Sequence, residues 1–119
     1  MARHEATNSL SIPASADLST HQFKFVEVDS NGRVAVANAS TDLPVGVLAN
    51  KPLAIDEPSE VQFDGRVKVI AGATVALGAR VMSNASGLAI TAATAGNIVK
   101  GVCLKGGAVN ELIEVWLIG

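Results

Sequence analysis

The side chains that could act as nucleophiles or bind a metal ion are few and widely spaced. Cys103 is the single cysteine, and it lies in a mostly apolar run from Val99 to Leu104, which is typical of a small core residue. The two histidines, His4 and His21, have no cysteine, aspartate or second histidine at a spacing that holds zinc. We therefore expect no thiol nucleophile and no metal site.

A short acidic segment resembles the opening of a calcium-binding loop. Asp29, Asn31 and Gly32 have the residue types that begin such a loop, but residues 36–41 offer no carboxylate to close it. Asn-Gly between two β-rich runs is also a strong signal for a hairpin, because both residues tolerate a positive φ. The hairpin explains these residues better than calcium binding does.

A second acidic cluster lies where Asp56, Glu57 and Glu60 surround Pro58. Carboxylates in a polar loop are usually solvated, although these could also bind a cation weakly or meet a basic patch on a partner. The chain contains no phosphate-binding loop and no Gly-x-Ser-x-Gly motif. No group of residues predicts catalysis, so we expect a protein that is not an enzyme and has no cofactor.

Residues 28–48 and 82–103 share a pattern at an offset of about 54 residues, which predicts that the elements that position these side chains come from one unit used twice. Most matched positions are small, apolar or turn-forming, which indicates a repeated folding unit and not a repeated set of reactive groups. The matched blocks are Val34-Ala35-Val36 with Leu88-Ala89-Ile90, and Gly46-Val47 with Gly101-Val102.

Short β-rich runs separated by turn formers fill the chain from Phe23 onward. Asp64-Gly65 indicates a second tight turn, and residues 73–77 could form one helical turn that ends at Gly78. No segment has a helical period over a normal helix length. The pattern predicts an all-β domain, a small barrel or sandwich of about eight to ten short strands.

Residues 1–20 differ from the rest and predict an extended N-terminal arm ahead of a β-rich domain at 21–119. Leu10 and Ile12 alternate with serines, which is the period of a strand with one apolar face. Such a strand could pair with a partner protein, and Pro13 is expected to keep it out of the body's own ladder. The alternative is a disordered tail. The candidate binding residues are Ser9, Leu10, Ser11, Ile12 and Pro13.

Composition and charge exclude several classes of function. The net charge is −2 and the basic residues are scattered singly, so we expect no nucleic-acid binding. The longest uncharged apolar stretch, residues 69–79, is about half the length that spans a bilayer. The N-terminus lacks the apolar core of a signal peptide, so we expect a protein made in the cytoplasm and not bound to a membrane.

Several segments together resemble one family of viral proteins. They are residues 32–36, 43–49, 72–103 and 114–119, in which a strand, a polar loop and an apolar strand follow one another. In this rhythm, and in its Ala/Gly/Val-rich body, the chain from about residue 23 to 119 resembles the head decoration, or cement, proteins of tailed bacteriophages. The resemblance implies a β-rich knob, often trimeric, on the outside of the capsid, with an N-terminal arm that pairs with the major capsid protein.

The resemblance leads us to expect a homotrimer that binds the expanded head and stabilises it. An apolar strand end at Trp116, Leu117 and Ile118 is the candidate subunit interface. One alternative is an adhesive or carbohydrate-binding fibre or tail module, although sugar sites favour aromatic platforms and this chain has one Trp and no Tyr. Another is a small enzyme whose site forms between subunits from Lys100, Lys105, Glu111 and Glu114.

Overall fold

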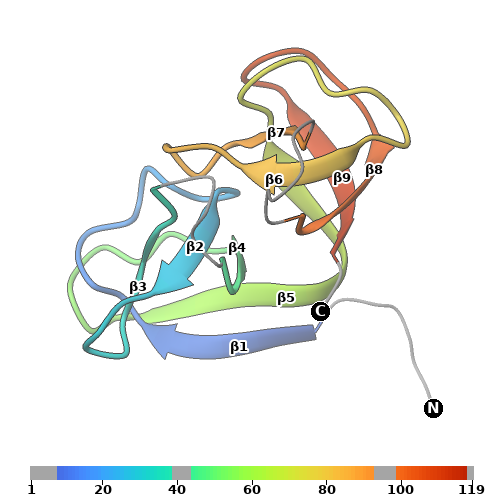
Figure 1. The fold of residues 1–119 in the computed structure, drawn as a ribbon. Coiled ribbons are helices and arrows are strands. Elements are labelled where there is room, and N and C mark those ends of the chain that lie inside the picture. The colour runs from blue at the N-terminus through green and yellow to red at the C-terminus, as the bar shows by residue number, and fades with distance from the viewer. Residues whose placement is uncertain (1–7, 39–43, 93–98, 118–119) are drawn as a thin grey trace.

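The computed structural model describes residues 8–38, 44–92 and 99–117, and in this part of the chain the fold is all-β, as predicted (Figure 1). Nine strands form one antiparallel sheet in the order β3-β2-β4-β5-β9-β8-β6-β7, with β1 paired to β5. No helix in the described part is long and apolar enough to cross a membrane. The strands are β1 (Asn8–Pro13), β2 (Phe25–Val28), β3 (Val34–Val36), β4 (Gly46–Leu48), β5 (Pro58–Ile70), β6 (Arg80–Ser83), β7 (Ala89–Thr91), β8 (Gly101–Lys105) and β9 (Leu112–Leu117).

The long strand β5 joins the two halves of the sheet, which we define as residues 8–64 and 65–117. Its first part pairs with β1 and β4, and its second part, from Gly65, pairs with β9. Gly65 has a φ of 91°, which a residue without a Cβ adopts easily, and β5 bends near this position (Figure 1). The tight turn predicted at Asp64-Gly65 is wrong, because ladder partners on both sides keep the chain extended through it.

Each half of the sheet curls back on itself. In the first half, Ala14 forms a parallel bridge with Val34, which brings the end of β1 beside β3. In the second half, Ala71 bridges Ala89 in the same way, at the end of β5 and the start of β7. The molecule therefore consists of two small curled units that lie side by side (Figure 1).

The helical turn suggested for residues 73–77 does not form. Val75 instead bridges Gly107 through two backbone hydrogen bonds of 3.0 and 3.1 Å. This bridge ties the connection before β6 to the connection after β8, so long-range pairing overrides the local helical tendency.

Strand pairing in the second half repeats that of the first half 55 residues further on. Val26 pairs with Val36 and Gly46, and Val81 pairs with Thr91 and Gly101. This register corrects one block of the sequence alignment by a single residue: Val34, Ala35 and Val36 correspond to Ala89, Ile90 and Thr91, and not to residues 88–90. A duplication as the origin of the two halves stays a prediction.

One side-chain oxygen holds the hairpin turn of each half. Asp29 Oδ1 accepts hydrogen bonds of 2.9 Å from the backbone N–H groups of Asn31 and Arg33. Asn84 Oδ1 accepts bonds of 2.8 and 3.0 Å from the N–H groups of Ser86 and Leu88. Asp29 is therefore a turn residue, as its sequence context indicated, and of the predicted Asn-Gly pair only Gly32 adopts a positive φ, of 76°.

Two apolar clusters fill the two halves. The cluster of the first half includes Val26, Leu48 and Val61. The larger cluster fills the second half and continues into the first half through Phe25, Ala37 and Val47. Because these three side chains belong to the first half and pack with the core of the second, the halves form one body.

The N-terminal segment belongs to the first half from residue 8 onward. Leu10 lies opposite Val61 in the ladder between β1 and β5, and Ala14 and Leu18 are buried in the core of this half. The prediction that Pro13 keeps the segment out of the body's own ladder is therefore wrong. Proline removes only one N–H donor, and Pro13 lies at the end of the ladder, where the loss is small. Residues 1–7 lie outside the described residues.

Candidate interaction surfaces

The candidate binding strand β1 presents side chains of two kinds. Ser9, Ser11 and Pro13 are exposed, and Leu10 is 45% exposed. Ile12 projects from the same side of the strand as Leu10 but packs against the core of the first half. Leu10 is thus available for a partner, whereas Ile12 mainly stabilises the fold.

The candidate subunit interface at the C-terminal end is divided by the alternation of β9. Trp116 is 50% exposed, but Leu117 is 1% exposed and belongs to the larger core cluster. The assignment of Leu117 to an exposed strand end is therefore wrong, because successive side chains of a strand point to opposite faces. Ile118 lies outside the described residues.

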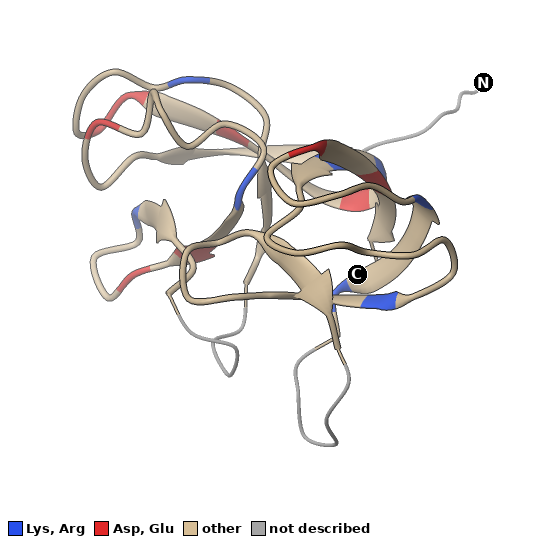
Figure 2. Ribbon diagram, turned by 90° about the horizontal axis from the view of Figure 1, so that it is seen from above, with Lys and Arg blue, Asp and Glu red and all other residues tan. Residues whose placement is uncertain are grey.

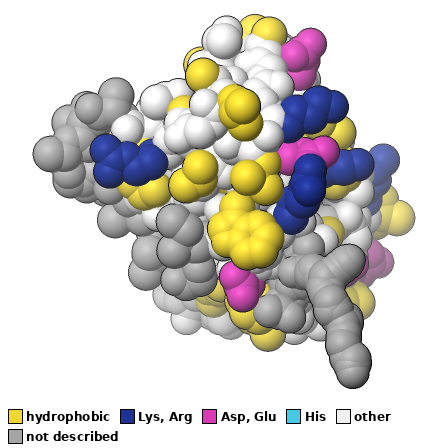
Figure 3. All heavy atoms as spheres, turned by 90° about the vertical axis from the view of Figure 1, so that its right-hand side faces the viewer, with side chains coloured by type: hydrophobic (Ala, Val, Ile, Leu, Met, Phe, Trp, Pro, Cys, Tyr) yellow, Lys and Arg dark blue, Asp and Glu magenta, His cyan; other side chains and the backbone are white. Residues whose placement is uncertain are grey.

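Trp116 stands on a sheet surface that combines cations with apolar side chains. It lies opposite Arg66 of β5, and its neighbour Glu114 lies opposite Lys68 of β5 and Lys105 of β8. Arg66 Nε donates a 2.6 Å hydrogen bond to Glu114 Oε1. Figure 3 shows hydrophobic side chains beside Lys and Arg side chains on this side of the molecule. We call this surface the basic face; its residues are Arg66, Lys68, Lys105, Leu112 and Trp116.

A small hollow of about 140 Å³ lies on the basic face, lined by Lys68, Lys105, Leu112, Ile113 and Glu114. A volume of this order holds about one benzene-sized group. The hollow could therefore accept one apolar side chain, with two ammonium groups and the Glu114 carboxylate beside it.

The loop before β5 has the opposite character. Leu53 and Ile55 are 66% and 55% exposed, and the neighbouring carboxylates are exposed as well. Asp56 Oδ1 accepts a 2.7 Å hydrogen bond from Arg33 Nε, and this bond lowers the pKa of Asp56. We call this surface the acidic face; its residues are Leu53, Ile55, Asp56, Glu57 and Glu60.

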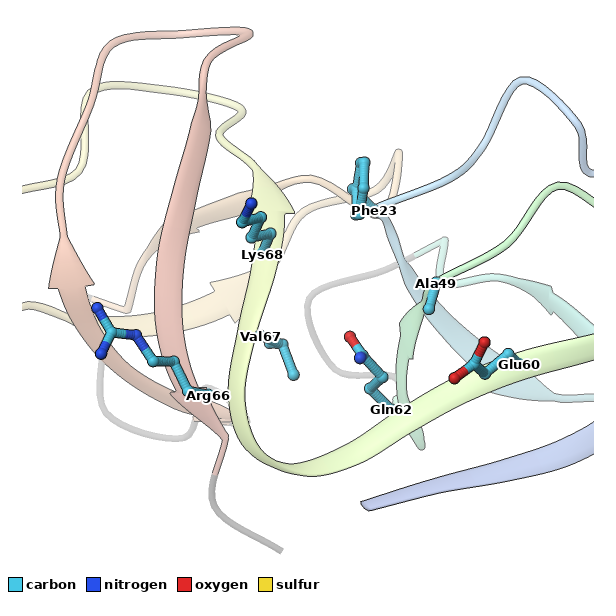
Figure 4. A pocket seen from close by; sticks show the side chains of 7 residues that line it. All are labelled: Phe23, Ala49, Glu60, Gln62, Arg66, Val67 and Lys68. Atoms are coloured by element: carbon cyan, nitrogen blue, oxygen red, sulfur yellow. The ribbon is translucent and has the colours of Figure 1, made fainter. Parts of the chain in front are cut away.

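A groove of about 370 Å³ lies between the two halves, at the bend of β5 (Figure 4). Phe23, Ala49, Glu60, Gln62, Arg66, Val67 and Lys68 line it. Phe23 has a φ of 68°, and its backbone joins the halves: its N–H donates to Leu48 O, and its carbonyl accepts from Ile70 N–H. Figure 4 shows the Arg66 side chain pointing away from Gln62, so these two polar groups do not converge.

The side chains that were considered for chemistry have structural surroundings. Cys103 is buried in the larger core cluster, and this burial raises the pKa of its thiol. His21 Nδ1 lies 3.0 Å from Lys24 Nζ, and the described residues contain no group of three acidic, cysteine or histidine side chains that could hold a metal. His4 lies outside the described residues.

The fold places the chain in a class of all-β structures that includes a phage head protein. The N base of the head fiber gp8.5 in bacteriophage phi29 aligns with a TM-score of 0.69 and 16% sequence identity, over 95% of each chain. At this identity the likeness shows a shared fold. None of the curated proteins matches the sequence.

The family follows from the sequence itself. The family model for phage cement protein matches residues 4–115, and the chain belongs to this family. The match confirms the resemblance that the repeated β pattern indicated, and it makes this a structural protein associated with a phage capsid.

Proposed function

We propose that the protein decorates the outer surface of an expanded phage head and stabilises the shell, after synthesis in the host cytoplasm. The observation that carries the proposal is the cement-protein family match over residues 4–115. The two exposed faces that combine charge with apolar side chains are also suited to docking.

A capsid presents many identical sites close together, so a homotrimer gains effective concentration from its own subunits. Modest affinity at each site then suffices. Any protein that binds the assembled shell and not its separated subunits stabilises the shell by mass action. This role requires neither nucleic acid nor membrane as a partner.

For attachment to the major capsid protein, we assign the segment from Ser9 to Pro13. This strand has one ladder partner among the described strands, β5, along its length. An extended segment of a capsid protein could add to its other edge, which is a common mode of peptide recognition. The exposed Leu10 would then supply the apolar contact.

Co-sedimentation with expanded, undecorated heads tests this function. We expect saturable binding and a shell that withstands a higher temperature or denaturant concentration than undecorated heads do. Heads that fail to retain the folded protein would contradict the proposal.

A second candidate is a base for a head fibre or another adhesive module. The observation that favours it is the fold shared with the N base of the head fiber gp8.5. Binding to host-cell glycans in the absence of heads would support this candidate over decoration.

A further inference from the structure

The two halves of the protein carry charge of opposite sign. Residues 8–64 contain eight acidic and three basic side chains, whereas residues 65–117 contain two acidic and five basic side chains. Figure 2 shows segments of both signs at both ends of the molecule, so the imbalance is one of number and not a complete separation. The small net charge therefore hides net charges of opposite sign in the two halves.

The acidic face lies on the loop before β5 and at the start of that strand, whereas the basic face lies on the far part of β5 and on β8 and β9. The loop that contains Leu53 and Ile55 leads into the start of β5 at Pro58, whereas Lys68 is near the other end of that strand. An extended chain advances about 3.3 Å per residue, and β5 bends only once on its way (Figure 1). Glu60 lines the groove together with Arg66 and Lys68. The loop residues Leu53, Ile55 and Glu57 do not line this groove, and they are exposed for contact with the basic face of a second copy.

We propose that the basic face of one copy binds the acidic face of a second copy, in a head-to-tail contact. The charges are complementary, since Lys68 and Lys105 would face Glu57 and Glu60. Complementary charge of this kind steers two proteins together and fixes the orientation of the contact.

The apolar side chains of the two faces are also complementary. Leu53 and Ile55 are exposed on the acidic face, and Leu112 and Trp116 are 47% and 50% exposed on the basic face. Either Leu53 or Ile55 can enter the hollow lined by Lys68, Lys105 and Leu112. Tryptophan is enriched among the residues that carry most of the binding energy of protein interfaces.

A second copy fits the basic face better than an unrelated acidic protein, because one molecule carries both complementary surfaces. A contact between different surfaces of identical subunits either closes into a ring or continues as a filament. The inference rests on the self-association within the proposed function, and it names the surfaces that form the contact. A closed ring would be the form that sits on the head.

Reversing the charges tests the contact. One variant combines Lys68→Glu with Lys105→Glu, and the other combines Glu57→Lys with Glu60→Lys. The control, Ser86→Glu with Thr91→Glu, adds negative charge to exposed positions of the second half outside the basic face. Sedimentation velocity measures association of the full chain, and circular dichroism checks that each variant folds.

We expect the parent and the control to associate below about 1 mM, and each reversal variant to associate at least about tenfold more weakly. An equimolar mixture of the two reversal variants should regain association, because each then meets a face of opposite charge. The uncharged variant Leu53→Ser with Ile55→Ser should weaken association without altering the net charge, which provides a second test if Glu57→Lys disturbs the loop.

A parent that stays monomeric at about 1 mM would overturn the inference, and so would reversal variants that associate as the parent does. Binding to heads is measured separately. Head binding without self-association would leave decoration standing and remove only the head-to-tail contact. Self-association without head binding would leave the head-to-tail contact standing and contradict decoration.

Discussion

Ile12 lies opposite Ser59 where β1 pairs with β5, and the Ser59 hydroxyl is buried there with no hydrogen-bond partner among the described residues. Glu57 O accepts a hydrogen bond from Ala14 N–H in the first half, and Glu111 O accepts one from Ala71 N–H in the second, so Glu57 and Glu111 are equivalent. Two residues further on, Ser59 therefore corresponds to Ile113. A serine thus occupies a site where the other half places an apolar core residue.

Replacing this serine should stabilise the protein. Ser59→Ala removes a buried hydroxyl that gains no hydrogen bond, so we expect the free energy of unfolding to rise by about 1 kcal/mol. Urea denaturation measures the change. Ser83→Ala is the matched control, because Ser83 is equally buried but its Oγ donates a 2.9 Å hydrogen bond to Asn84 O. A loss of stability in both variants would contradict the prediction.

The two apolar residues of β1 should respond differently to a charge. Ile12→Asp places a carboxylate against the core of the first half and should lower the free energy of unfolding by about 2 kcal/mol or more. Leu10→Asp changes an exposed position, so stability should stay within about 0.5 kcal/mol of the parent. Denaturation curves of the two variants give both values, and equal losses would count against the described position of β1.

Leu10→Asp also tests the proposed function, because it should leave the fold intact while it alters the strand that we assign to capsid binding. We expect weaker co-sedimentation with expanded heads. Unchanged binding would move the attachment site away from β1.

Two equivalent glycines should tolerate no side chain. A Cβ at Gly46 would overlap the carbonyl oxygen of Gln62, and a Cβ at Gly101 would overlap that of Trp116. Backbone atoms of a paired strand cannot move aside easily, so Gly46→Ala and Gly101→Ala should each destabilise the protein by about 3 kcal/mol, at the upper end of core overpacking.

Gly78→Ala is the comparison for these two variants. A Cβ there meets nothing within 4 Å, and only its φ of 84° is unfavourable. We expect a loss of about 1 kcal/mol from the left-handed backbone alone. If thermal unfolding gave the same loss for all three variants, close backbone contact would not be the cause.

Stability should fall as the pH drops below neutral, in part through His21. Burial, and then the nearby Lys24 ammonium, lower the pKa of His21 below its ordinary value of 6.5. The unfolded chain therefore binds a proton more readily than the folded chain, so the contribution of His21 to stability is present above pH 6.5 and is lost as the pH falls below it.

His21→Gln should reduce this dependence. The measurement is the free energy of unfolding at pH 7.5 and at about pH 5.5, a range that lies above the ordinary pKa values of carboxylates. Parent and variant curves with the same slope over this range would show that His21 does not contribute.

Local patterns determined much of this protein in advance. Runs of β-branched residues between turn formers, without a helical period, indicated an all-β fold. The hairpin at Asn31-Gly32 and the core position of Cys103 are likewise properties of residues close together in the chain. The same short segments carried the resemblance to cement proteins, which the family match confirms.

Tertiary structure alone decided which strands pair and which face of each strand meets a core. Asp64-Gly65 has the residue types of a turn, but β1, β4 and β9 keep it extended. A shift of one residue moves every side chain of a strand to the other face, which is why Leu117 is buried while Trp116 is exposed. The basic face, too, exists only because folding brings Lys68 of β5 beside Lys105 of β8 and Trp116 of β9. Pairing, register and burial depend on contacts between residues far apart in the chain, and a local pattern does not contain them.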